Sequence, residues 1–309
     1  MSDHAIQITD VRHRYGDREA LRGVSFDIRC GEVFALLGPN GSGKTTLFRL
    51  LSTLMPLQSG TIDFLGHDVA TEPAAVRSRL GVVFQAPSLD KKLRVEENLV
   101  CHGKLYGLTG QKLRERVDEG LTRFGIADRR GDYVESLSGG LARRVELAKC
   151  LMHQPAVLLL DEPSTGLDPG ARADLWRALA DAQAAGVTVV ATTHLLEEAE
   201  RADRIAILHQ GELAALDTPA ALQASVGGDT ITVRTAEPNK LADAITEALS
   251  VEATALDGTV RLETTTGPDL AIELYSRFRE QIDELSIGKP TLEDVFVART
   301  GARFESDSE

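Results

Sequence analysis

The sequence predicts an α/β fold built on a mostly parallel central sheet. Two runs, residues 32–37 and 157–161, are almost continuously apolar, which is typical of strands covered by helices on both faces. A glycine-rich segment, residues 38–46, separates the first run from the helical pattern behind it. Polar groups follow three of the predicted strands, and open α/β sheets bind ligands at the carboxyl ends of their strands. A ligand site is therefore expected at that edge.

Length and composition are those of a globular protein with one large domain or two ordinary ones. The chain has 309 residues, of which 42% are hydrophobic and 26% charged. No apolar run approaches the roughly 20 residues that span a bilayer, and Met1–His4 does not begin a secretory signal. The three cysteines, Cys30, Cys101 and Cys150, show no metal-ligand spacing. Their odd number disfavours a disulfide framework, so we expect a reducing cytoplasm.

The net charge of −13 is concentrated near the C-terminus, where residues 221–309 hold 17 acidic against 8 basic side chains. Such a surface repels nucleic acid and anionic lipid head groups. A phosphate ligand stays compatible with it, because a glycine-rich loop supplies its own local donors. The charge predicts solubility and no nucleic-acid partner.

Residues 5–37 predict short sheet strands at 6–8, 24–28 and 32–37, the last of them central. Tyr15 lies in a polar turn between the first two strands. A tyrosine there is by itself more often a surface anchor than a ligand contact. Ahead of a nucleotide-binding loop, however, it can stack on an adenine ring.

Residues 38–46 fit the phosphate-binding pattern G-x-x-x-x-G-K-[ST] at each fixed position. Glycines let several N–H groups point at one centre, and the N-terminus of the following helix adds a positive dipole end. Lys44 would reach the β- and γ-phosphates, and the Thr45 hydroxyl would ligate Mg²⁺. The apolar stripe of that helix is Leu47, Leu50, Leu51 and Leu54. The candidate phosphate contacts are Gly38, Pro39, Asn40, Gly41, Ser42, Gly43, Lys44, Thr45 and Thr46.

The next part alternates strand and helix and then becomes helical. The predicted elements are strands at 61–65 and 81–84, a short helix at 74–79, and helices at 95–107 and 111–124. Gln85 follows the second strand, and a lone glutamine at the end of a strand is usually only a polar residue that ends it. The all-helical part, from 90 to about 135, interrupts the alternation. We interpret it as an inserted helical subdomain, delimited at about 90–150, where a partner protein docks.

Leu137, Ser138, Gly139 and Gly140 stand directly before the next predicted helix. A serine and two glycines at a helix N-terminus repeat the anion-binding design of the loop at 38–46. By itself this match is weak, because the same residues form a common helix cap. The apolar face of the helix carries Leu141, Val145, Ala148 and Leu151.

Residues 157–161 predict a buried strand that ends in two carboxylates, Asp161 and Glu162. Asp161 is the natural partner of Mg²⁺, directly or through water. Glu162 can orient and deprotonate an attacking water, and general-base help of this kind is worth about 10²–10⁴-fold. A plain strand-end turn is the alternative, and the phosphate loop upstream favours the catalytic interpretation.

A turn at 163–169 and one helix lead to a strand at 187–192, which is followed by His194. A histidine at a strand end is more often structural than catalytic. Here it is the third strand end that carries a polar group beside the same crevice, which favours function. Strands at 204–208 and 212–216 close the region.

Beyond a short helix within 218–228, the pattern changes to β-α-β-β-α-β, the order of a split-βαβ, ferredoxin-like unit. Its elements are predicted at 230–234, at 241–249, on both sides of Asp257-Gly258, at 269–280 and at 284–287. A last helix begins at a capping-box pattern, Thr291–Asp294, and stops near Gly301. Residues 220–309 show no catalytic constellation, so a structural or dimer-contact role is expected.

Together these pieces resemble the nucleotide-binding domain of ATP-binding cassette (ABC) transporters over roughly residues 5–220. Seven family motifs stand in the family's order and spacing. They are Tyr15 (A-loop, stacking on adenine), residues 38–46 (Walker A), Gln85 (Q-loop), Leu137–Gly140 (signature), 157–161 with the catalytic Glu162 (Walker B), Ser164 to Asp168 (D-loop) and His194 (switch histidine). The resemblance implies ATP and Mg²⁺ as cofactors. It implies Thr45, Gln85 and Asp161 as metal ligands, and Lys44, Gln85, Glu162 and His194 as the catalytic set.

One departure is visible at Leu141, where the family usually has Gln after the signature glycines. A contact of that Gln with the ribose or the partner subunit is therefore not carried over. The segment Pro290–Phe296 resembles the C-terminal unit of ABC-2-type exporter ATPases of the daunorubicin-resistance and nodulation-factor kind. The expected domains are a nucleotide-binding domain at 5–220, an accessory α+β domain at 229–301 and a flexible tail at 302–309.

The resemblance implies an ATPase that energises export of a drug, lipid or glycoconjugate through a separate permease, at the cytoplasmic face of the cell membrane. Two copies would assemble head to tail, so that Ser138 of one caps the γ-phosphate held by Lys44 of the other. An importer ATPase is the nearest alternative, since its catalytic residues are the same. A soluble ABC protein of translation or DNA repair is disfavoured, because the chain shows neither two cassettes nor long coiled coils.

Overall fold

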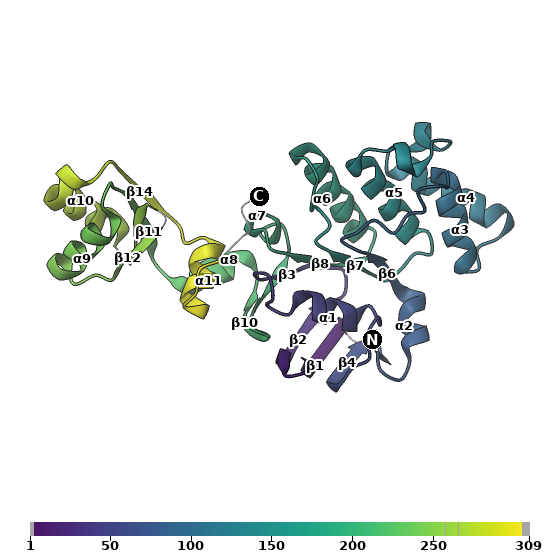
Figure 1. The fold of residues 1–309 in the computed structure, drawn as a ribbon, viewed down its shortest axis with the longest axis horizontal. Helices are drawn as coiled ribbons and strands as arrows, with labels where there is room; N and C mark the ends of the chain where they lie inside the picture. Colours follow the sequence, from purple (N-terminus) through teal and green to yellow (C-terminus); the bar gives the residue numbers. More distant parts are fainter. Residues whose placement is uncertain (1–2, 257, 265, 305–309) are drawn as a thin grey trace. The chain divides into compact units, whose positions relative to one another are not determined.

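The chain divides into two units, one that ends at Leu216 and one that spans Asp217–Phe304 (Figure 1). The computed structural model describes residues 3–256, 258–264 and 266–304 of it. The first unit contains an antiparallel sheet, a six-stranded central sheet and an inserted group of helices. The second contains a four-stranded sheet with its own helices. This is the predicted fold class, an α/β cassette followed by a small α+β unit.

The N-terminal antiparallel sheet has the strand order β2-β1-β4-β5. Its strands are β1 (His4–Tyr15), β2 (Arg18–Arg29), β4 (Ser59–Phe64) and β5 (His67–Asp68). β1 and β2 are longer than the short runs that the apolar pattern predicts. Register shifts interrupt their pairing, including one between Ile8 and Val11, and such irregularities blur the period-two alternation.

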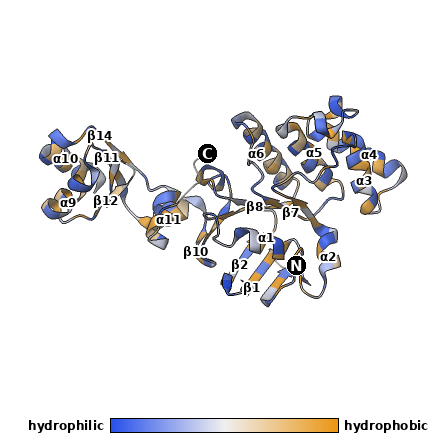
Figure 2. Cartoon of the chain, in the orientation of Figure 1, coloured by the Kyte–Doolittle hydropathy of each residue, from blue (hydrophilic) through white to orange (hydrophobic). Residues whose placement is uncertain are grey.

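The central sheet has the order β10-β9-β3-β8-β7-β6. Its strands are β3 (Val33–Leu37), β6 (Leu80–Val83), β7 (Val157–Asp161), β8 (Thr188–Thr193), β9 (Arg204–His209) and β10 (Glu212–Asp217). β3 pairs in parallel with β8 and β9, and β7 pairs in parallel with β6 and β8. Every residue of β3 is buried, and Figure 2 shows the apolar character of the neighbouring β7 and β8. The prediction of a mostly parallel sheet with residues 32–37 at its centre is confirmed.

Helices cover both faces of this sheet, with α1 on one side and α6 on the other (Figure 1). The helices of this part are α1 (Lys44–Leu51), α2 (Pro73–Arg79), α5 (Gly139–Leu151), α6 (Pro169–Ala184) and α7 (Leu196–Ala199). The predicted apolar stripe of α1 is wrong at Leu54, which is 57% exposed. The helix ends earlier because Thr53 adopts a left-handed backbone with φ 59°.

The inserted helices are α3 (Val95–Leu105) and α4 (Gly110–Arg123), followed by two 3-10 turns, η1 (Ala127–Arg129) and η2 (Val134–Ser136). α3 and α4 contact each other and α5. Leu105, inside the helix predicted at 95–107, continues its apolar pattern but is 84% exposed, because it lies in the last turn of α3, beyond the packed face. No helix in the described ranges is long and apolar enough to cross a membrane.

The second unit begins with α8 (Pro219–Val226) and forms a ferredoxin-like sheet of order β12-β13-β11-β14. All its strand pairs are antiparallel. The remaining elements are β11 (Asp229–Arg234), α9 (Pro238–Leu249), β12 (Ala253–Leu256), β13 (Thr259–Thr264), α10 (Gly267–Phe278), η3 (Arg279–Gln281), β14 (Glu284–Gly288) and α11 (Leu292–Thr300). Asp257, in the predicted turn, lies outside the described residues, as does the tail from 305.

α9 and α10 pack on one face of this small sheet, whose core includes Ile231, Val233 and Leu262. α11 starts at the predicted capping box, in which the Asp294 amide donates to the Thr291 hydroxyl and the Thr291 amide to the Asp294 carboxylate. α11 packs against α8. The order β-α-β-β-α-β is thus confirmed.

Candidate nucleotide-binding site

The phosphate-binding loop lies between β3 and α1, as predicted. Gly43 has a left-handed backbone with φ 110°, and a Cβ there would lie 2.8 Å from the carbonyl oxygen of Ala20. A Cβ at Gly38 would collide with the carbonyl oxygen of Leu208. The loop therefore needs glycine at both positions. The Ser42 hydroxyl is buried and, within the described residues, has no hydrogen-bond partner, which fits a phosphate oxygen as the partner.

Lys44 opens α1 and is only 3% exposed. Its Nζ donates to the carbonyl oxygens of Gly38 at 2.6 Å and Pro39 at 3.1 Å. Burial lowers the pKa of Lys44, while the carboxylates of Glu162 and Asp161 act to raise it. An ammonium group has three donors, so the two bonds to the loop leave one for a ligand.

A pocket of about 200 Å³ opens over this loop. Its lining consists of Tyr15, Arg18, Ala20, Asn40, Gly41, Gly43, Lys44, Thr45, Thr46 and Arg49. Arg18 and Arg49 were not predicted, and together with Lys44 they make the lining cationic, as an anionic ligand requires.

Tyr15 lies at this pocket, where the sequence places an adenine contact. Its hydroxyl donates to Sδ of Met55 at 3.2 Å, and its ring meets the His13 ring edge-on with centroids 4.7 Å apart. The side chain is still 44% exposed. An aromatic surface anchored at one end and open to solvent suits stacking.

Asp161 ends β7 and is held by β8. The Thr192 hydroxyl donates to Oδ1 of Asp161 at 2.7 Å and accepts from the amide of Glu162 at 3.0 Å. Burial is the largest effect on the Asp161 carboxyl and raises its pKa, whereas the Thr192 hydrogen bond acts to lower it. The Thr192 hydrogen bond thus favours the ionised form of Asp161, against the effect of burial. No sequence pattern marks Thr192, because a threonine in a strand is commonplace.

Two other predicted residues, Gln85 and His194, reach Glu162 from separate loops. Nε2 of Gln85 donates to Oε2 of Glu162 at 3.2 Å, and Nδ1 of His194 lies 3.4 Å from Oε1. Glu162 itself has a left-handed backbone, φ 42°, which is uncommon outside glycine. Its carboxylate is therefore fixed between an amide and an imidazole.

The candidate magnesium ligands Thr45, Gln85 and Asp161 all offer oxygen atoms, which Mg²⁺ prefers. Gln85 donates through its amide nitrogen to Glu162, so its amide oxygen stays available. Only one of the three is a carboxylate, and the part of the chain that the structure describes shows no group of three His, Cys, Asp or Glu residues able to hold a metal. The donor set fits Mg²⁺ that arrives with a nucleotide, whose phosphates complete the shell.

The signature residues Leu137–Gly140 are not among the residues that line the loop pocket. Ser138 is exposed and caps α5, its hydroxyl accepting from the Leu141 amide at 3.4 Å. Of the D-loop residues, Asp168 caps α6 by accepting from the Ala171 amide at 2.9 Å. A single chain thus brings together Walker A, Walker B, Gln85 and His194 but leaves the signature apart.

Arg143 of α5 is a residue that the sequence did not single out. It donates to the carbonyl oxygens of Phe84 at 2.8 Å and Gln85 at 3.2 Å, and it forms a buried ion pair with Glu146 at 2.8 Å. α5, against which the inserted helices α3 and α4 pack, is thereby tied to the backbone that carries Gln85. The only local signal is an acid three residues after a base on a helix, which usually marks a surface pair.

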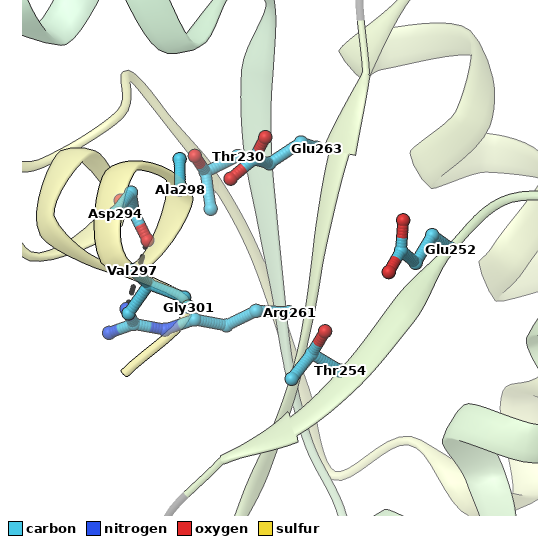
Figure 3. A pocket seen from close by; sticks show the side chains of 9 residues that line it. All are labelled: Thr230, Glu252, Thr254, Arg261, Glu263, Asp294, Val297, Ala298 and Gly301. Carbon is cyan, nitrogen blue, oxygen red and sulfur yellow. Dashed lines mark hydrogen bonds and ion pairs between the residues drawn. The ribbon is translucent and has the colours of Figure 1, made fainter. Parts of the chain in front are cut away.

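A larger cavity, of about 560 Å³, lies in the second unit beside α11 (Figure 3). Figure 3 shows Arg261 directed at Asp294, to which it donates at 3.0 Å, with Glu252 and Glu263 elsewhere on the wall. Burial raises the pKa of Glu263, and the like charges of Asp294 and Glu252 raise it further. Three carboxylates against one guanidinium make this wall unsuitable for a nucleotide.

Comparison with known proteins agrees with this geometry. The family model described as ABC transporter matches residues 21–165. A second model, described as AAA domain, putative AbiEii toxin, Type IV TA system, matches residues 143–200. The daunorubicin resistance ATP-binding protein DrrA3 of Streptomyces coeruleorubidus is 40% identical over 97% of both chains. The Nod factor export ATP-binding protein I of Paraburkholderia xenovorans (strain LB400) is 37% identical over 99% of this chain and all of its own.

Solved structures are also similar. CbiO1 from Clostridium perfringens, part of the ABC transporter complex cbiONQ, has a TM-score of 0.68 and 27% identity, covering 81% of this chain and 97% of its own. The ATP-binding cassette MJ0796, solved as a dimer in a post-hydrolysis state with ADP and Pi, has a TM-score of 0.63 and 26% identity over 69% of this chain and 98% of its own. The chain therefore belongs to the ABC transporter family, as an ATP-binding subunit with ATPase activity.

Proposed function

We propose that this chain is the ATP-hydrolysing subunit that energises export through a separate membrane permease. The observation that carries the proposal is the convergence of Gln85 and His194 on Glu162, beside the loop that holds Lys44. Relatives named for daunorubicin resistance and Nod factor export, matched along nearly the whole chain, support export. The cargo is a drug, lipid or glycoconjugate, which the permease contacts.

In this mechanism, Lys44, the Ser42 hydroxyl and the backbone N–H groups of the loop at 38–46, among which Pro39 has none, hold the phosphates, and Tyr15 stacks on the adenine. Thr45, Asp161 and Gln85 would hold Mg²⁺, which supplies neutralisation of phosphate charge. Glu162 accepts a proton from the attacking water.

His194 steadies the γ-phosphate, and it also limits the freedom of Glu162, from which it lies 3.4 Å away. Gln85 links this group to the inserted helices through its backbone, which Arg143 holds.

The site is completed by a second copy of the chain. Ser138 is exposed and separate from the loop pocket of its own chain, as a residue that serves a partner's nucleotide has to be. A C2 arrangement places Ser138 and the Gly139 and Gly140 amides of each copy on the γ-phosphate held by the other. The dimeric cassette bound to ADP and Pi supports this assembly.

The permease docks on the inserted helices, on the cytoplasmic side of the membrane. A hollow of about 220 Å³ lies there, between α3, α5 and β6, with His102, Tyr106 and His153 in its wall. The rings of Tyr106 and His153 stack 3.7 Å apart beside the exposed Leu105. Burial lowers the pKa of His102 to about 4, so this imidazole stays neutral and, with the two stacked rings, offers an apolar surface to a partner segment, while Arg77 and Lys149 add positive charge elsewhere in the wall.

The deciding experiment is the variant Glu162→Gln. The amide keeps the size of the side chain but accepts no proton, so ATP turnover should be lost while an ATP-bound dimer accumulates in size-exclusion chromatography. Turnover at the parent rate would refute Glu162 as the base. Export is tested by isolating the chain with its permease: a complex that needs an extracellular solute-binding protein would instead identify an importer.

A further inference from the structure

Glu198 is a buried carboxylate on the short helix α7, four residues after His194. It is only 2% exposed. Each of its oxygens has a separate hydroxyl partner: the Ser164 hydroxyl donates to Oε1, and the Thr193 hydroxyl donates to Oε2 at 2.7 Å. Nε of Arg172 lies 3.8 Å from Oε1. An ionised carboxylate inside a protein is costly unless such partners satisfy it, so its presence here calls for a reason.

The two hydroxyl partners belong to the two segments that flank the reacting group. Ser164 comes two residues after Glu162, at the start of the D-loop, and Thr193 comes directly before His194. The Thr193 hydroxyl also accepts from the amide of Leu195 at 3.0 Å, which fixes the backbone on the other side of His194. Glu198 therefore bridges the chain segments that carry Glu162 and His194.

Through Ser164, Glu198 is also connected to an exposed segment of the chain. Thr165, Gly166 and Asp168 follow Ser164 and are exposed, so the D-loop is open to contact, while its first serine is buried on Glu198. A displacement of the D-loop would therefore move the Glu198 carboxylate through its bond to Ser164. The carboxylate would in turn move Thr193, to which it is also bonded. No other described side chain bonds to both Ser164 and Thr193.

We propose that Glu198 is a positioning residue for ATP hydrolysis, which holds Glu162 and His194 in register and couples that register to the D-loop through Ser164 and Thr193. The inference rests on the function proposed above. It assigns no contact between Glu198 and the nucleotide. Its effect is expected on the chemical step, because the phosphate contacts of residues 38–46 do not involve it.

The test compares Glu198→Ala and Glu198→Gln with the matched control Glu197→Gln, an exposed neighbour on the same helix. Glu198→Ala should lower kcat at least tenfold with less than a twofold change in KM for ATP. Glu198→Gln should recover part of the loss, since its amide oxygen still accepts from one hydroxyl. Glu197→Gln should match the parent. A purely structural role would instead lower Tm and the active fraction without this kcat-against-KM split.

If Glu198→Ala does not fold, Thr193→Val and Ser164→Ala answer the same question, because each removes one bond of the bridge. Each should lower kcat, and combining either with Glu198→Gln should add little, as expected for residues that act as one unit. Parent-level kcat in Glu198→Gln and Thr193→Val overturns the inference. The proposed function fails separately, by turnover at the parent rate in Glu162→Gln.

Discussion

His194 and Glu162 face each other across the carboxyl ends of two neighbouring strands, with Nδ1 of the imidazole 3.4 Å from Oε1 of the carboxylate. They are 32 positions apart in the chain, and the parallel pairing of β7 with β8 brings them together. In the proposed mechanism, the pair would hold the carboxylate close to the γ-phosphate that Lys44 binds. Substitutions at either residue can test whether the pair is needed for hydrolysis.

Replacing the imidazole should slow the chemical step. His194→Ala removes a side chain expected to steady both the γ-phosphate and Glu162, so we expect kcat to fall by about 10²-fold, at the lower end of acid–base contributions. ATP binding should persist, because the loop contacts are intact. Phosphate release under saturating ATP measures the effect, with His67→Gln on the N-terminal sheet as control. An unchanged kcat in His194→Ala would argue against this arrangement.

The pH dependence should report on Thr192. Its hydrogen bond acts to lower the pKa of Asp161, which burial raises. As the proposed Mg²⁺ ligand, Asp161 would have to be ionised, so we expect activity to fall as the pH falls through its pKa. Thr192→Val removes the bond and raises that pKa, and the acidic limb of the ATPase profile should move up by about one pH unit.

Thr192→Ser is the matched control, because it keeps the hydroxyl and loses only a methyl group. Its profile should overlay that of the parent. A downward shift of the acidic limb in Thr192→Val would contradict the assignment of Asp161.

Much of this site can be predicted from the sequence because its motifs are formed by residues that are close together in the chain. The glycine-rich loop at 38–46, the apolar run ending at Asp161 and the capping residues Thr291–Asp294 each depend on neighbours within a few residues. The contacts that fix the site are of another kind. Arg143 reaches the carbonyl of Gln85 across 58 positions, and Glu198 reaches Ser164 across 34.

Those long-range partners depend on which strands become neighbours, and no periodicity in the chain encodes that choice. Leu54 and Leu105 show the same limit of sequence-based prediction, but here the pattern predicts packing that the structure does not have. Both continue a helical apolar pattern, yet the helices stop before or at them, and tertiary packing leaves them in solvent.

Complementation should reveal whether sites are shared between copies. Lys44→Ala removes the phosphate grip, and Ser138→Arg blocks the signature, so each variant alone should be inactive. In an equimolar mixture, half of the dimers are mixed and each has one intact composite site. About a quarter of the parent activity should therefore return. Two inactive variants whose mixture stays inactive, while mixed dimers are present by mass spectrometry, would speak against a head-to-tail dimer.

The Arg143–Glu146 pair should behave as a buried ion pair. Arg143→Met leaves the Glu146 carboxylate with the Ser88 amide and hydroxyl but without its cationic partner, and it frees the backbone at Gln85, so the free energy of unfolding should fall by about 3–5 kcal/mol. Arg143→Met/Glu146→Leu removes both charges and should regain most of the stability. Urea unfolding measures both changes. A double variant as unstable as the single one would mean that the bonds to the backbone, and not the charge, dominate.

The backbone of Glu162, with φ 42°, has an evolutionary consequence. A residue with a Cβ atom pays a conformational penalty of about 1–2 kcal/mol in this region, which glycine avoids. Selection for stability alone would favour glycine directly after β7. A search for thermostable variants of this chain would therefore favour replacing Glu162 by glycine, the replacement that, in the proposed mechanism, ends hydrolysis.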